Sequence, residues 1–254
     1  MDRFKVTGVV VIIVGIILAG TLIGDILPTV GDVTSPANSY LSPYYIENAL
    51  HDTEAPNIVT AVLADYRGFD TLFETCVMFL SGITTLLVLL SKRKIAKVNP
   101  NSMDTRGISF SGTVLDTAFR IIIPIIVIYA FYVLAHGEIS LGGGFQAGAL
   151  LGIVYMIDRL IPSIQYSGAF FTEETAAMTA GVGVFIYGLT GILPILNGGN
   201  FLEYENLPFG FAVKETEFLH SVGIFLIEIG VTVCVMATII NILEVVLERT
   251  KFHD

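Results

Sequence analysis

Long apolar segments, separated by short polar ones, run through the 254-residue chain. A helix that crosses a lipid bilayer needs about 20 predominantly apolar residues. Segments of about this length occur at residues 6–24, 71–90, 115–135, 143–161, 176–196 and 218–243. The pattern therefore predicts an all-α integral membrane protein with about six transmembrane helices.

Composition supports a membrane location. The chain is 54% hydrophobic and only 14% charged, whereas soluble domains carry about a quarter charged residues. Its net charge of −10 argues against a nucleic-acid partner. Cys76 and Cys234 both lie inside apolar segments, which favours small buried hydrophobes over a disulfide or a metal pair. We expect a multi-pass protein of the cell membrane.

Basic residues are distributed asymmetrically between the polar segments, and positive charges remain on the cytoplasmic side. With six spans and both termini cytoplasmic, the cytoplasmic set is Arg3, Lys5, Lys92, Arg93, Lys94, Lys97, Arg106, Arg159, Arg249 and Lys251. Arg67 and Lys214 then lie outside. The basic segment 92–110 is predicted to be a cytoplasmic linker between a two-span part, residues 1–91, and a four-span part, residues 111–254.

The stretch from His136 to Gly148 is the shortest connection between two long apolar segments, and it holds three consecutive glycines, Gly142 to Gly144. Its spacing is not that of a phosphate-binding loop. We interpret it as a tight turn whose glycines let membrane helices approach closely. His136 can relay protons at the membrane surface, or it can cap the end of the preceding helix.

Charged residues inside a bilayer are costly and mark candidate ion sites. Glu228 lies near the middle of the last apolar segment, and His220 precedes it by two helical turns on roughly the same face. Glu228 can hold or pass a proton, offer oxygen to Na⁺ if hydrated, or hydrogen-bond another helix in a structural role. Glu74, one turn inside the second span, is either part of an ion entrance or a solvated helix start.

Several kinds of chemistry have no visible residues. The six apolar segments contain no lysine, and the sequence contains no CxxC, nucleophile-elbow or H-E-x-x-H motif. We therefore expect no metal centre, no cofactor and no enzymatic activity of the chain's own.

The glycine stretch resembles the signature of the B subunit of Mrp-type (Mnh) multisubunit Na⁺/H⁺ antiporters. The similarity covers about residues 106–246, although Leu141 stands where the family commonly has proline. The matching residues are Gly142, Gly143, Gly144, Phe145, Ala147 and Gly148.

Residues 57–74 are similar instead to the carboxy-terminal end of the A subunit of the same antiporters. In archaeal membrane-bound hydrogenases and the related sulfane sulfur reductases, this tail occurs as a small E-like subunit. The matching residues are Asp65, Arg67, Gly68, Asp70 and Glu74. A fusion of the E-like part to a B-like part would account for the two-plus-four arrangement.

These resemblances imply a non-catalytic subunit that helps to form or seal a Na⁺ path in an Mrp antiporter or a related respiratory complex. Its partners would be A/D-like, C-like, E-, F- and G-like membrane subunits, hydrogenase-like redox subunits in a respiratory complex, and the ions Na⁺ and H⁺. The alternative is a self-contained homo-oligomeric cation transporter. The candidate ion residues are Glu228, His136, Glu74 and His220.

Overall fold

The computed structural model describes residues 12–21, 31–32, 34–35, 40–90, 113–161, 171–208 and 216–250. Within these ranges the regular secondary structure is helical and contains no β-strand, which confirms the all-α prediction. The chain divides into two units, Met1–Asn48 and Ala49–Asp254. The basic linker predicted at residues 92–110 lies outside the described residues.

The first unit contains the helix Ile12–Thr21, which lies inside the first predicted span and exposes its large apolar side chains. Helix α2, Ser42–Thr53, begins in this unit and ends in the second. This helix lies in the polar segment between the first two long apolar segments of the sequence. The dipeptide Ser42-Pro43 is a helix-start signal, because proline fixes a helical φ and needs no donor in the first turn.

The second unit contains the long helices. They are α4 (Gly68–Leu90), α5 (Thr113–Ala135), α6 (Gly144–Leu160), α7 (Glu173–Leu196) and α8 (Thr216–Thr250). All except α6 contain a segment long and apolar enough to cross a membrane, so the described residues supply four candidate spans. Helix α6 has 17 residues and extends about 25 Å at 1.5 Å per residue. The chain is therefore a multi-pass membrane protein, while the total of six spans and the cytoplasmic termini stay predictions.

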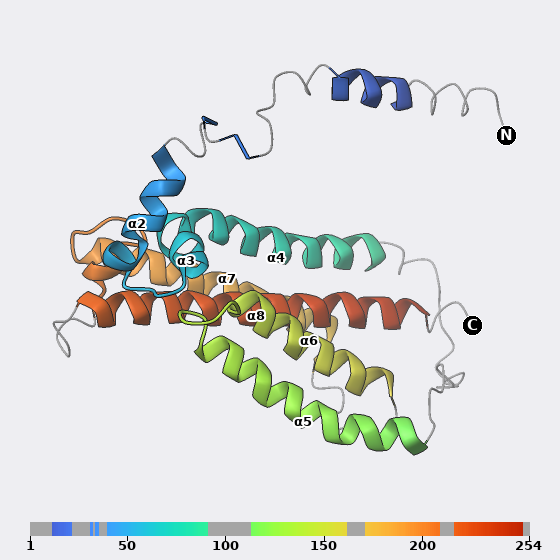
Figure 1. Cartoon of the computed structure of the whole chain (residues 1–254). Helices are drawn as coiled ribbons and strands as arrows, with labels where there is room; N and C mark the ends of the chain where they lie inside the picture. The colour runs from blue at the N-terminus through green and yellow to red at the C-terminus, as the bar shows by residue number, and fades with distance from the viewer. Residues whose placement is uncertain are drawn as a thin grey trace. The chain divides into compact units, whose positions relative to one another are not determined.

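Helix α8 is the centre of the second unit. In its most apolar segment 61% of the residues are buried, against 11% in α4. Helices α4, α6 and α7 pack against α8, and α5 packs mainly against α6, as Figure 1 shows. The outer helices therefore leave apolar faces uncovered, and α8 supplies most of the interior.

Glycine brings α6 close to α8. Gly144, Gly148 and Gly152 recur every four residues, so they share one face of α6. A Cβ atom added at Gly148 would lie 2.8 Å from the carbonyl oxygen of Thr232. Only glycine allows this backbone approach, which is the usual role of small residues between membrane helices.

A short irregular segment precedes α4. It consists of α3, Ile58–Thr60, followed by the π-helix η2, Ala61–Tyr66. Asn57 caps this segment, because its side-chain oxygen accepts a hydrogen bond from the backbone N–H of Val59 at 3.0 Å. The cap and the π-helix place Asn57, Thr60 and Asp65 beside the start of α8 and the connection between α5 and α6, as their hydrogen bonds show.

Candidate functional site

The Glu228 carboxylate of α8 lies directly against the connection between α5 and α6, residues 136–143, which we call the glycine turn. Glu228 is only 9% exposed. A Cβ atom added at Gly137 would collide with both carboxylate oxygens, and one added at Gly143 would lie 2.6 Å from Oε1. At these two positions any side chain would displace the carboxylate from the place it occupies beside the turn. The structure thus brings together the two features that the sequence singled out separately.

The glycine turn is held from its other side by the segment before α4. The backbone N–H of Asn57 donates to the carbonyl oxygen of Glu138 at 3.0 Å, and its side-chain amide donates to the carbonyl oxygen of Ser140. The Thr60 hydroxyl donates to the carbonyl oxygen of Gly137 at 2.6 Å. We call these three bonds the Asn57–Thr60 latch. They fix the turn above Glu228.

The glycine turn also contacts α8 through polar groups. The Ser221 hydroxyl donates to Oε2 of Glu138 at 2.9 Å, and Ser221 precedes Glu228 by about two turns of the same helix. The Thr232 hydroxyl lies within hydrogen-bond distance of two carbonyl oxygens, that of Glu228 at 2.8 Å and that of Gly144 at 3.1 Å. Glu138 is the carboxylate that acts electrostatically on Glu228. The site therefore holds two acidic groups on one side of the α6–α8 contact.

His220 belongs to a second polar group about 12 Å further along α8, which is the rise of eight helical residues. Its Nδ1 lies 2.8 Å from Oδ2 of Asp65, and its Nε2 lies 3.7 Å from Oε1 of Glu205. The edge-on ring of Tyr204 packs against the imidazole with centroids 5.9 Å apart. The family-motif residue Asp65 and the candidate His220 are thus brought together, and the pair joins η2 to α8.

Tyr204 also belongs to this second polar group, because its ring packs on His220. Burial raises the pKa of its phenol well above the ordinary value of 10.0, with smaller contributions from Tyr187, Asp65 and Glu228. Its hydroxyl donates to the carbonyl oxygen of Ala64 at 2.7 Å. The phenol is therefore a hydrogen-bond donor, and it ties the loop before α8 to the π-helix.

His136 lies on the glycine turn, and its side chain contacts Tyr132 of α5. Its Nδ1 lies 2.9 Å from the carbonyl oxygen of Tyr132, and its ring stacks on the Tyr132 ring at 4.1 Å. This is the geometry of a cap on the end of α5, the second of the two roles that the sequence allows.

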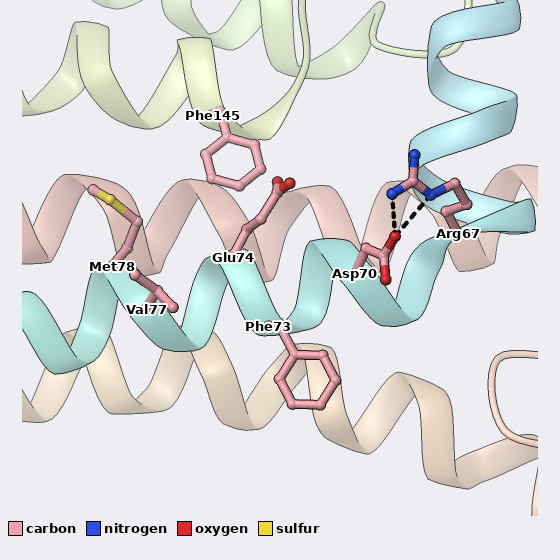
Figure 2. Close-up of a pocket in the computed structure, with 7 residues that line it drawn as sticks. All are labelled: Arg67, Asp70, Phe73, Glu74, Val77, Met78 and Phe145. Atoms are coloured by element: carbon pink, nitrogen blue, oxygen red, sulfur yellow. Dashed lines mark hydrogen bonds and ion pairs between the residues drawn. The ribbon is translucent and has the colours of Figure 1, made fainter. Parts of the chain in front are cut away.

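Glu74 is exposed and lines an open groove at the start of α4 (Figure 2). In the same groove the Arg67 guanidinium donates from Nε to Oδ2 of Asp70 at 2.7 Å. Phe145 reaches the groove from α6, and Phe73, Val77 and Met78 complete it. The groove therefore contains residues of the A-subunit-like motif, Arg67, Asp70 and Glu74, and one residue of the B-subunit-like motif, Phe145. Glu228 does not line this groove.

The other end of the α6–α8 contact is also polar. Arg159 donates to both carboxylate oxygens of Glu244, at 2.7 and 3.2 Å, and the Tyr155 hydroxyl donates to Oε1 at 2.9 Å. Glu244 is buried. The sequence predicts a cytoplasmic position for Arg159 but identifies neither Glu244 nor Tyr155 as a neighbour.

Sequence reasoning missed Asn57, Thr60 and Tyr204 as parts of this site. Asn57 carries a recognisable signal as a helix cap before an apolar run. That signal does not indicate a contact with Ser140, which lies 83 positions further along the chain. Among the described residues, no group of three or more His, Cys, Asp or Glu side chains is placed to hold a metal ion.

Comparisons with known proteins agree on one family. A family model described as a domain related to the MnhB subunit of Na⁺/H⁺ antiporter matches residues 114–241, and a second, described as the E subunit of MBH, matches residues 7–104. The B subunit of the Na⁺/H⁺ antiporter of Bacillus subtilis is 26% identical over 131 residues, covering 50% of this chain and 91% of that protein.

Two further matches cover more of the chain. A protein of Rhizobium meliloti, named as the probable A/B subunit of a K⁺/H⁺ antiporter, is 23% identical over 229 residues, or 80% of this chain. The chain spans only 22% of that protein's length. A chain of the archaeal membrane-bound sulfane sulfur reductase has the same fold, with a TM-score of 0.64 at 24% identity over 93% of this chain and 98% of that one.

The MnhB-related model covers half of the sequence, including the glycine turn, α6 and Glu228. The chain therefore belongs to the family of domains related to the MnhB subunit of Na⁺/H⁺ antiporters.

Proposed function

We propose that this chain is a non-catalytic membrane subunit of a multisubunit cation/proton antiporter module, and that it helps to form or seal the Na⁺ path. Its family membership supports the antiporter module. One relative is named for Na⁺ and another for K⁺. Transport measurements on the assembled complex should therefore compare these two cations.

The observation that carries the proposal is the position of Glu228. A carboxyl group buried in a membrane helix is costly and is retained mainly on substrate and ion paths or proton relays. Here it lies against two glycines of the turn, Gly137 and Gly143, and the Asn57–Thr60 latch holds that turn through three hydrogen bonds. A buried acid in this position can bind an ion and release it again while the packed helices around it block free passage through the membrane.

Two matches favour a respiratory complex over a stand-alone antiporter. A chain of the sulfane sulfur reductase has the same fold as this chain, with a TM-score of 0.64. The match of residues 7–104 to the E subunit of MBH points in the same direction. Its partners would then be the other antiporter-like membrane subunits together with hydrogenase-like redox subunits.

Purification through a tag on the native chain tests this proposal. We expect other antiporter-like subunits to copurify, and we expect Na⁺-dependent proton movement in liposomes that contain the whole assembly. Sodium uptake by liposomes that contain this chain alone would contradict the proposal and support a self-contained transporter.

A further inference from the structure

The contacts around the Glu228 carboxylate distinguish between the ions that it could bind. Its two oxygens lie against Gly137, and Oε1 also lies against Gly143. Both neighbours are glycines, so neither brings a ligating side chain to the carboxylate. At these two contacts the carboxylate packs against backbone rather than against polar side chains.

Three carbonyl oxygens of the glycine turn already have hydrogen-bond partners. The oxygens of Gly137, Glu138 and Ser140 accept hydrogen bonds from the Asn57–Thr60 latch. Hard cations in proteins are held by several oxygen ligands at once. At Glu228 the described residues offer the carboxylate and no group of acidic side chains that would complete such a shell.

Charge leads to the same conclusion. The charged group that acts on Glu228 is Glu138, another carboxylate, and the phenol of Tyr204 also interacts with Glu228 electrostatically. A buried carboxylate without a cationic partner is costly, whereas the neutral acid avoids most of this cost. A proton binds to a single carboxyl group and needs no further ligand at this site.

We propose that Glu228 is a proton-binding site of the antiporter module, occupied as the neutral acid under the glycine turn, and is not a ligand of the transported metal cation. This inference rests on the proposed function and names the ion that the site would carry. The metal cation would then pass through the module without binding this carboxylate.

Infrared difference spectroscopy of the whole complex in membrane vesicles tests the proposal. We expect a carbonyl stretch from a neutral carboxyl group at neutral pH. The band should disappear in Glu228→Gln and remain in Glu174→Gln, which removes an exposed carboxylate at the start of α7. Replacing sodium or potassium with the bulky cation N-methylglucamine should leave the band unchanged.

Loss of the band when sodium or potassium is added would overturn the proposal, because it would show a cation bound to the carboxylate. A wild-type complex that lacks the band at neutral pH would overturn it as well. If Glu228→Gln fails to assemble, Glu228→Asp keeps the acid and is expected to shift the band, and an unshifted band would assign it to another residue. A complex that shows the band but transports nothing would refute the proposed function alone.

Discussion

Gly148 is the clearest example of a residue whose absent side chain determines the packing. We expect Gly148→Ala to destabilise the protein by about 1–3 kcal/mol, the usual cost of overpacking, because the new Cβ would lie 2.8 Å from the carbonyl oxygen of Thr232. The control is Gly188→Ala in α7, where nothing lies within 4 Å of the added atom. Thermal unfolding in detergent should show a lower midpoint for the first variant. An equal effect of both substitutions would contradict the close α6–α8 contact.

At this scale the sequence shows which residues are unusual but not which ones meet. A glutamate in an apolar segment and three consecutive glycines are both visible in the printed sequence. Their contact joins residues that are far apart in the chain, and nothing in either pattern specifies that pairing. The close approach of Gly137 to Glu228 follows only from the crossing of α6 and α8.

The Asn57–Thr60 latch connects two elements, the segment before α4 and the glycine turn, and we expect it to keep the turn ordered. Removing its two side-chain bonds with Asn57→Ala and Thr60→Val should raise the hydrogen-exchange rate of the amides of residues 137–143, because each lost bond contributes about 0.5–1.5 kcal/mol. As a control, Asn197→Ala removes a side-chain bond to the carbonyl oxygen of Asn206, away from the turn. Unchanged exchange in the double variant would show that these two side-chain bonds do not hold the turn.

The Arg159–Glu244 pair fastens the opposite end of α6 to α8. Arg159→Met should destabilise the protein by about 3 kcal/mol, because it leaves a buried carboxylate without its cation. The double variant Arg159→Met with Glu244→Met should recover most of this loss. Unfolding midpoints in detergent provide the measurement, and a double variant as unstable as the single one would show that the ion pair itself stabilises the contact.

Helix boundaries were predictable where an apolar run ends at a strong signal. The expected span at residues 176–196 differs from α7 only at its start, where Thr172 caps the helix and accepts from the backbone of Thr175. Helix α4 starts at Gly68, three residues before the predicted start at residue 71. The prediction begins too late because glycine and aspartate, here Gly68 and Asp70, disfavour the interior of a helix. The π-helix at Ala61–Tyr66 was not predictable, since tertiary contacts such as the Asp65–His220 bond stabilise it.

The orientation of the whole molecule in the membrane is predicted from the distribution of its basic residues. In a variant in which Cys76 and Cys234 are replaced, a cysteine at position 94, which lies outside the described residues, should be labelled only from the cytoplasmic side. A cysteine in place of the exposed Leu141 on the glycine turn should be labelled only from the other side. The reverse labelling would place the glycine turn and Glu138 in the cytoplasm.

The class of protein was predictable because bilayer thickness imposes a length on every apolar helix. Which helix lies at the centre was not predictable. The most apolar segments of α8 and α5 have the same mean hydropathy, yet α8 is the central helix. What distinguishes α8 is its small and polar residues, Gly230, Thr232 and Cys234 among them, which are buried against three neighbouring helices.

The most direct test of the central claim is the ion transport of the assembled complex with Glu228→Gln. Vesicles that contain the variant complex at wild-type subunit levels should show Na⁺-dependent pH changes slowed at least about tenfold, the equivalent of about 1.4 kcal/mol in a barrier. Vesicles with Glu174→Gln should behave as the wild type. Unchanged transport in the assembled Glu228→Gln complex would contradict the account and leave Glu228 with a structural role.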